Sequence, residues 1–162
     1  MASQLAFDLP TNVRLGMADF FVSDANVLAY ALIQAPQSWP GNKLSLIGPA
    51  GSGKTHLARV FAAQTATTIM NAKDVRADTG LPDGNVILED GDALREEGEE
   101  WLFHVYNAFS RDGFTLLLTS RLPPARWDIT LPDLASRLST ITSAKIENCS
   151  LYHSDAADYL LF

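Results

Sequence analysis

One run of eight residues constrains the fold of this chain more than any other feature. Residues 48–55 (GPAGSGKT) match the pattern G-x-x-x-x-G-K-[ST], a glycine-rich loop that binds phosphate. They follow the apolar run 44–47 and open a helical pattern over 57–63. A strand, a glycine loop and a helix in this order are the context that the motif requires. A glycine-rich turn without a ligand is the alternative, and the sequence favours the phosphate-binding loop.

Each part of this loop has a role in binding a polyphosphate. Glycine permits positive φ, so consecutive N–H groups turn toward an anion, and the positive end of the next helix adds to the attraction. Lys54 reaches the β- and γ-phosphates, and the hydroxyl of Thr55 binds Mg²⁺. The sequence therefore predicts a site for ATP or ADP with Mg²⁺. Its expected nucleotide-binding residues here are Pro49, Ala50, Gly51, Ser52, Gly53, Lys54, Thr55 and His56.

Size, charge and cysteine usage limit the classes of function. The 162 residues suffice for one domain with a core, and 47% of them are hydrophobic. Twelve basic residues stand against 19 acidic ones, a net charge of -7, and the basic residues are scattered, so we expect no direct binding to DNA. No apolar run approaches the roughly 20 residues that span a membrane. The N-terminus lacks the pattern of a secretory signal and Cys149 is the single cysteine, which predicts a cytoplasmic protein.

Apolar runs alternate with helical patterns along the rest of the chain. Strands without clean polar alternation, separated by helices, are typical of a parallel sheet covered on both faces. We expect residues 72–84 to form mostly loop. The predicted strands are 44–47, 66–71, 85–90, 114–120 and 143–147, and the predicted helices are 27–33, 57–63, 96–109 and 131–138. The sequence thus predicts a three-layer α/β fold with a mostly parallel five-stranded sheet flanked by helices.

Polar residues follow two of these strands. Because the carboxyl ends of parallel strands meet at one edge, Glu89, Asp90, Thr119 and Ser120 are expected beside Lys54. A carboxylate at a strand tip holds Mg²⁺, the role expected of Glu89, and the next one orients the attacking water, the role expected of Asp90. A hydroxyl at the tip of the other strand, Thr119 or Ser120, senses the γ-phosphate. The alternative is that these polar groups are only solvated strand ends.

The order of these parts resembles the AAA+ ATPases, and within them the DnaA/Hda family. Residues 19–26 are similar to the segment that those proteins lay along adenine, and 99–107 to the helix after their second Walker motif. Residues 117–124 resemble the sensor-1 strand and 134–138 the arginine-finger box. The resemblance implies a P-loop NTPase fold of the AAA+ base type over residues 13–147. It also implies that Phe21, Val22 and Asn26 bind the nucleotide and that Arg137, with Asp90 and Ser120, is catalytic.

The N-terminal segment distinguishes members of this family. Gln4, Leu5, Phe7 and Leu9 resemble the peptide with which Hda-like regulatory inactivators of DnaA bind the sliding clamp. A glutamine followed by spaced apolar side chains suits a surface pocket of a partner. Such a pocket would form a hydrogen bond with the side-chain amide and bury two or three of the apolar side chains. The alternative is that these side chains cover the edge of the core. The segment 1–12 is thus expected to be an extended clamp-binding element, and the Hda-like type is favoured over DnaA itself.

Three departures from the family affect the expected activity. Glu89 stands where the family usually has Asp, and Arg121 where initiators commonly have an acid. Residues 148–162 form a short tail, too short for the family's helical lid. We therefore expect weak or no intrinsic ATP hydrolysis.

The resemblance implies a regulator of chromosomal replication initiation. Its expected partners are the DnaA initiator and the sliding clamp of DNA polymerase III, with self-association as a further possibility. Arg137 would promote hydrolysis of ATP bound to DnaA. Two alternatives remain open: a small P-loop ATPase or kinase with its own substrate, and an adaptor with a vestigial nucleotide site.

Overall fold

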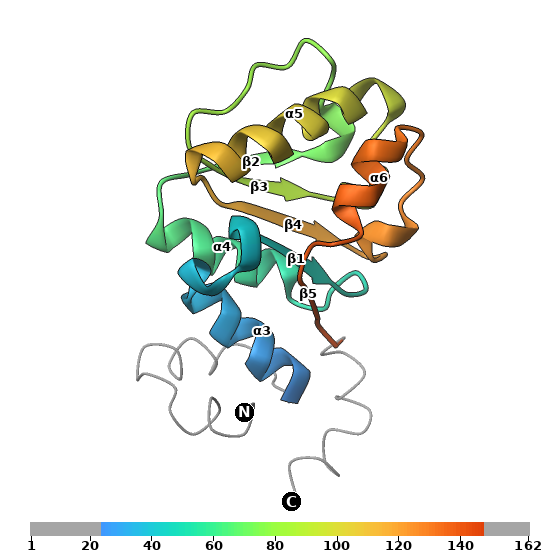
Figure 1. Ribbon diagram of the computed structural model, residues 1–162. Helices are drawn as coiled ribbons and strands as arrows, with labels where there is room; N and C mark the ends of the chain where they lie inside the picture. The colour runs from blue at the N-terminus through green and yellow to red at the C-terminus, as the bar shows by residue number, and fades with distance from the viewer. Residues whose placement is uncertain (1–23, 148–162) are drawn as a thin grey trace, which may run out of the picture.

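A computed structural model of the protein describes residues 24–147, in which one sheet lies between two layers of helices (Figure 1). The five strands of the sheet lie in the order β2-β3-β4-β1-β5. Every pairing between neighbours is parallel, so the prediction of a five-stranded sheet is confirmed and the sheet is parallel throughout. The strands are β1 (Lys43–Ile47), β2 (Thr67–Asn71), β3 (Asn85–Glu89), β4 (Leu116–Ser120) and β5 (Ser143–Lys145).

The helices lie close to where the apolar periodicity predicts them. The α-helices in the described residues are α3 (Asp24–Gln34), α4 (Lys54–Gln64), α5 (Glu96–Asp112) and α6 (Pro132–Leu138). Helix α5 extends past the expected end at residue 109 to Gly113, whose φ of 80° lets its N–H reach the carbonyl of Phe109. Short 3₁₀ turns are η1 (Pro36–Ser38), η2 (Pro40–Asn42), η3 (Ala72–Asp74), η4 (Gly91–Ala93) and η5 (Pro124–Arg126). Within 72–84 only η3 is helical, as the loop prediction required.

The central strands are apolar on both faces because each face carries its own helical layer (Figure 1). Ile87 of β3 belongs to the cluster that packs with α3 and α4. Its neighbours Val86 and Leu88 belong to the cluster that packs with α5 and α6. Successive side chains of a strand point to opposite faces, so an unbroken apolar run fits a sheet buried on both sides. The three-layer prediction is therefore confirmed.

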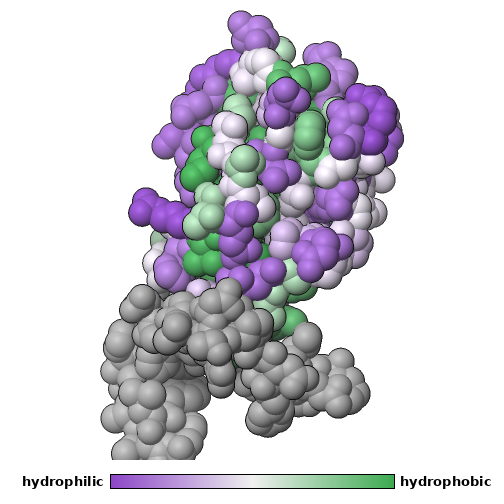
Figure 2. All heavy atoms as spheres, turned by 90° about the vertical axis from the view of Figure 1, so that its left-hand side faces the viewer, coloured by the Kyte–Doolittle hydropathy of each residue, from purple (hydrophilic) through white to green (hydrophobic). Residues whose placement is uncertain are grey.

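The two ends of the sheet differ in character. Figure 2 views the molecule from the amino ends of the strands, where hydrophilic residues lie between the hydrophobic ones over much of the surface. The strands point toward the opposite end, where the connections leave β1, β3 and β4 (Figure 1). Ligands of open parallel sheets bind outside the carboxyl ends of the strands. A ligand of this sheet is therefore expected at the carboxyl ends of the strands.

Several predictions lie outside the described residues. These are the nucleotide contacts of Phe21 and Val22, and the clamp-binding residues Gln4, Leu5, Phe7 and Leu9. The division of the chain at residues 12 and 147 likewise stays a prediction. Among the residues that the structure describes, no helix is long and apolar enough to cross a membrane.

Candidate functional site

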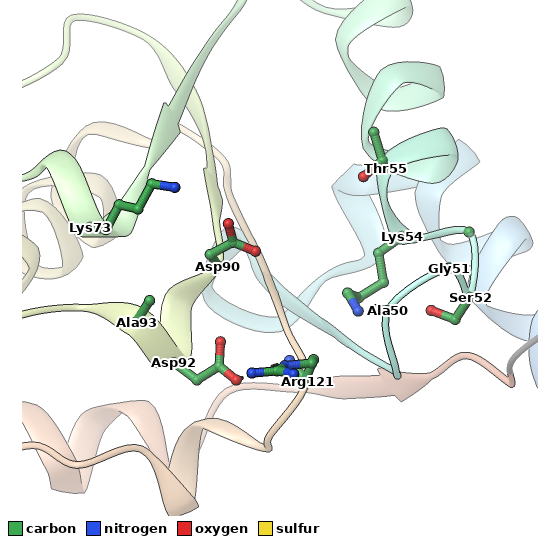
Figure 3. A pocket seen from close by; sticks show the side chains of 11 residues that line it. Ala50, Gly51, Ser52, Lys54, Thr55, Lys73, Asp90, Asp92, Ala93 and Arg121 are labelled. Atoms are coloured by element: carbon green, nitrogen blue, oxygen red, sulfur yellow. Dashed lines mark hydrogen bonds between the residues drawn. The ribbon is translucent and has the colours of Figure 1, made fainter.

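A cleft of about 750 Å³ opens at the carboxyl end of the sheet (Figure 3). Its walls come from the loop after β1, from η3 after β2, from the turn after β3 and from the tip of β4. Segments far apart in the sequence thus meet at one edge, as the parallel sheet requires. The lining residues are Ala50, Gly51, Ser52, Gly53, Lys54, Thr55, Lys73, Asp90, Asp92, Ala93 and Arg121.

The glycine loop after β1 has a conformation that few other sequences reach. Gly53 lies at φ 104° immediately before α4, in the left-handed region that favours glycine. At Gly48 a side chain would lie 2.7 Å from the carbonyl oxygen of Ile146, so the loop passes close to the segment after β5. These two glycines let the chain turn tightly from β1 into α4. The turn brings the N-terminus of α4, with its unpaired N–H groups, to the cleft.

Lys54, the first residue of α4, points back over the loop. Its Nζ donates to the carbonyl oxygen of Gly48 and, at 3.0 Å, to that of Pro49. Burial lowers the pKa of Lys54, the carboxylates of Asp92 and Asp90 oppose this, and Arg121 adds to it. The ammonium group therefore lies close enough to all three of these side chains to interact with their charges across the cleft.

Two carboxylates line the cleft, and only one of them was predicted. Asp90 follows β3 at φ 55°, and its Oδ2 accepts a hydrogen bond of 2.8 Å from Nδ2 of Asn71. Asp92, in η4, was missed because the sequence argument stopped at the strand end. Glu89 ends β3, is half-buried, and is not among the lining residues. The acids at the cleft are thus Asp90 and Asp92.

At the end of β4 the side chain of Arg121 lines the cleft, whereas the hydroxyl of Ser120 forms a hydrogen bond within the protein. Ser120 is buried, and its Oγ donates to the carbonyl oxygen of Leu122 at 2.6 Å. Thr119 is also buried. Arg121, the next residue, lines the cleft. Lys73 lines it from the far side, after β2, and was not predicted because it lies in a turn that belongs to no recognised motif.

Two further predicted residues do not line the cleft. Asn26 on α3 is buried, and its Oδ1 accepts the N–H of Glu147 at 2.9 Å, which joins α3 to the segment after β5. The ring of His56 on α4 lies 6.3 Å from that of Tyr30 on α3. Neither Asn26 nor His56 is among the lining residues.

Arg137 lies on the surface of α6, in the other helical layer. It is exposed, and its Cζ lies 5.4 Å from the ring centre of Phe103 and 6.0 Å from that of Tyr106. It does not line the cleft of its own chain. An exposed arginine held over aromatic rings is available to a partner molecule rather than to the cleft beside β1.

The residues of the cleft fit a magnesium ion. Mg²⁺ in proteins is usually bound by one or two carboxylates together with the phosphates of a substrate and water. The hydroxyl of Thr55 and the carboxylates of Asp90 and Asp92 face one cleft and supply such oxygens. No group of three or more His, Cys, Asp or Glu side chains gathers anywhere in residues 24–147. A metal here would therefore depend on phosphate oxygens for part of its coordination.

Comparison of the sequence with known proteins finds no matching family model. The chain is 25% identical over 173 aligned positions to the chromosomal replication initiator protein DnaA of two strains of Porphyromonas gingivalis. The alignment covers 90% of this chain and 37% of each of those proteins, so the chain spans well under half of their length.

Solved structures share the fold. A DNA replication initiation factor matches with a TM-score of 0.66 at 19% identity, over 90% of this chain and 53% of that one. The initiator DnaA bound to AMPPCP and single-stranded DNA gives 0.65 at 21% identity, over 81% of this chain and 49% of that one. Domain III of DnaA from Thermotoga maritima gives 0.60 at 20% identity, over 81% and 66%. The arrangement of strands and helices is therefore similar to that of DnaA domain III.

Proposed function

The chain belongs to the DnaA family of AAA+ proteins, and we propose that it binds ATP or ADP at the cleft and regulates the initiation of chromosomal replication. The observation that carries the first part is the cleft itself. A glycine loop, a helix N-terminus and Lys54 form one wall, and the carboxylates of Asp90 and Asp92 face them from the turn after β3. A solved DnaA structure of the same fold is bound to the nucleotide analogue AMPPCP, which supports this assignment.

Binding of a polyphosphate would use groups that are already in place. The N–H groups at the start of α4 would donate hydrogen bonds to a phosphate held by the loop. The dipole of the helix also favours negative charge at its N-terminus. The ammonium of Lys54 would exchange the carbonyl oxygens of Gly48 and Pro49 for phosphate oxygens. Magnesium would be held by Thr55 with Asp90 or Asp92, and would supply positive charge to the phosphates.

The regulatory role rests on Arg137 and on the family relationship. Arg137 is exposed and lies outside its own cleft, as an arginine finger acting on a neighbouring molecule must. We propose that it enters the site of ATP-bound DnaA and stabilises the charge that develops on the γ-phosphate. Residues 4–9 would bring the protein to the sliding clamp, and with it to DnaA.

Nucleotide binding is tested by calorimetry with ATP and with ADP on the full chain. Lys54→Ala removes the cation of the loop and should weaken ATP binding about ten-fold or more, because charge-assisted hydrogen bonds are lost. The matched control is Lys145→Ala, since Lys145 is exposed on β5 and does not line the cleft. Equal affinity of wild type and Lys54→Ala would remove the proposed nucleotide site.

The regulatory role is tested by hydrolysis of ATP bound to purified DnaA, in the presence of loaded sliding clamp. Arg137→Ala should abolish stimulation, since arginine fingers contribute ~10³–10⁵ in rate in other systems. Arg111→Ala, an exposed arginine of α5, serves as the control and should stimulate normally. If Arg137→Ala stimulates as well as wild type, the finger role is wrong, whatever the calorimetry shows.

A second candidate function is that of an ATPase that hydrolyses ATP in its own cleft, and one observation favours it. Thr55 and Asp90 line the same cleft, so a metal and an attacking water have protein ligands within this chain. Steady release of phosphate by the purified protein without DnaA, lost in Lys54→Ala, would support this candidate over the regulator.

A further inference from the structure

The two edges of the sheet differ in how they are protected against pairing with a further strand (Figure 1). At one edge, β5 has only three residues, of which Ser143 and Lys145 are exposed. The segment after β5 is tied to α3, because Oδ1 of Asn26 accepts the N–H of Glu147 at 2.9 Å. A short edge strand and an exposed lysine are devices that keep the edge of a sheet from pairing with other chains.

The other edge strand, β2, has neither of these devices. It is five residues long and contains no proline, and no residue from 60 to 72 is charged. Among residues 24–147, its backbone forms hydrogen bonds with β3 only. The N–H and C=O groups on the outer side of an edge strand point away from its sheet. A strand from another molecule can therefore form hydrogen bonds with this side of β2.

The side chains of β2 are accessible as well. Thr68 and Ile69 are exposed, and Ile69, the middle residue of the strand, is 50% exposed. In the adjacent strand β3 the three central residues are buried. Threonine and isoleucine are both enriched in strands. An accessible, uncharged strand of this composition suits the addition of an extended segment to the sheet.

We propose that β2 is a site of self-association, at which the β2 strands of two copies of this chain pair antiparallel about a two-fold axis at Ile69. A two-fold interface uses the same surface of both copies, so that surface must be compatible with itself. In this register Thr67 of one copy faces Asn71 of the other, and the two Ile69 side chains meet at the axis. Lys73, the first charged residue after the strand, would face Thr65, so like charges do not oppose each other.

Charge also favours this edge as the place where two copies meet. The chain carries a net charge of -7, so two copies repel each other in general. They approach at the lowest electrostatic cost through a surface without charges, and residues 60–72 provide one. A second copy supplies a strand of the same length that is likewise uncharged.

The expected dimer is weak. A strand of five residues is about 17 Å long. Pairing along this length buries less than the roughly 1,200 Å² of the smaller specific interfaces, so we expect association in the micromolar range of concentration. The inference is independent of the proposed nucleotide site, because no residue of β2 lines the cleft.

Sedimentation velocity of the full chain over a range of concentrations tests self-association. Wild type should shift from monomer toward dimer as the concentration rises. Ile69→Lys places like charges opposite each other at the axis and should weaken dimerisation about ten-fold or more, while circular dichroism checks that it folds. The matched control is Leu28→Lys, because Leu28 is an exposed leucine of α3, the helix that contacts β5 at the other edge. It should dimerise as wild type does.

Oxidative cross-linking tests the register, in a Cys149→Ser background that removes the single native cysteine. Ile69→Cys would bring the two thiols to the axis, where facing Cα atoms lie about 4.5 to 5.5 Å apart, within the range of a disulfide. Thr68→Cys, at the neighbouring exposed position, would place the Cα atoms on a diagonal about 7 to 8 Å apart. It should cross-link much less, because this distance exceeds what a disulfide spans.

Each result supports or overturns the inference. A wild type that stays monomeric at every concentration overturns it. So does dimerisation of Ile69→Lys at wild-type strength, or equal cross-linking of Ile69→Cys and Thr68→Cys. If Ile69→Lys does not fold, the two cysteine variants decide. Calorimetry with nucleotides is a separate measurement, so a failure of this inference is distinguishable from a failure of the proposed nucleotide site.

Discussion

Lys43 is the first residue of β1 and Lys54 is the first residue of α4, and the two lysines differ in what surrounds them. Lys43 at the amino end is buried, donates to Gly41 O at 2.9 Å and Ser110 Oγ at 2.6 Å, and lies 4.1 Å from the ring centre of Tyr106. Lys54, past the carboxyl end, contacts only carbonyl oxygens of its own loop among the described residues, in an open cleft. Lys43 is part of the packing. Lys54 is available to a ligand.

The same contrast holds for two other charged residues. The buried carboxylate of Glu99 on α5 accepts the N–H and the hydroxyl of Thr130 and the N–H of Leu131, at 2.9 to 3.1 Å, just before α6. Arg121 at the cleft has a fixed backbone and an unengaged guanidinium. A charge whose hydrogen bonds are satisfied within the protein contributes to structure, whereas an accessible charge without them is suited to binding an ion of opposite sign.

Glu99→Ala should produce the largest loss of stability among the changes that test this contrast. It removes the buried carboxylate that accepts the N–H and hydroxyl of Thr130 and the N–H of Leu131, and the loss of these charge-assisted hydrogen bonds costs about 3 kcal/mol of the free energy of unfolding. Urea unfolding followed by circular dichroism measures it. The control is Glu100→Ala, an exposed neighbour on the same helix, which should change stability by less than about 0.5 kcal/mol. Similar values for the two variants would show that Glu99 has no structural role.

Gly91→Ala tests whether the wall of the cleft is rigid at the turn after β3. A side chain at Gly91, between Asp90 and Asp92, would lie 2.2 Å from the ring of Trp127. Overpacking of this kind costs about 2 kcal/mol, and thermal unfolding would detect it. At Gly80 a side chain meets nothing within 4 Å, so Gly80→Ala serves as the control. Unchanged stability in Gly91→Ala would mean that the turn and the ring of Trp127 can move apart at little cost in free energy.

The smallest expected effect is a pH dependence from Lys43. Burial lowers the pKa of Lys43 below its ordinary value of 10.5, so in the window between the two values the unfolded chain binds more protons than the folded one. The penalty for burying the charge is fully present below this window and is relieved as pH rises through it. The stability of wild type relative to Lys43→Met should therefore increase between pH about 7 and about 10.

Urea unfolding at the two pH values measures this difference. The same comparison with Lys145→Met, a change of an exposed lysine, corrects for the other groups that titrate. A difference between wild type and Lys43→Met that does not change with pH would contradict the assignment.

Local patterns predicted most of the fold for a physical reason. Runs such as Val86-Ile87-Leu88 are apolar without alternation because both faces of the sheet are covered, and this property is visible in a single strand. The end of α5 was placed early because the helix continues until Gly113 takes a positive φ. The loop motif predicted the position of Lys54 at the cleft in the same way, since its strand, glycines and helix are neighbours in sequence.

The opposite wall of the cleft was predicted less completely. At the end of β3 the sequence offers Glu89, Asp90 and Asp92, and which of them line the cleft depends on the left-handed turn at Asp90 and on the 3₁₀ turn after it. Lys73 comes from a turn after β2 that has no motif. Arg121 was noticed only as a departure from the family. None of these placements follows from spacing along the chain.

The sequence by itself determined the layers of this protein and the glycine loop between β1 and α4, because strand periodicity, helix periodicity and glycine conformation are local properties. Only the tertiary structure decided that Lys73, Asp92 and Arg121 join Lys54 in one cleft, and that Asn26, Glu89 and Arg137 are not among the residues that line it. The reason is that the strand order β2-β3-β4-β1-β5 and the turns after each strand bring distant residues to one edge. That order depends on how whole strands pair and not on any one segment.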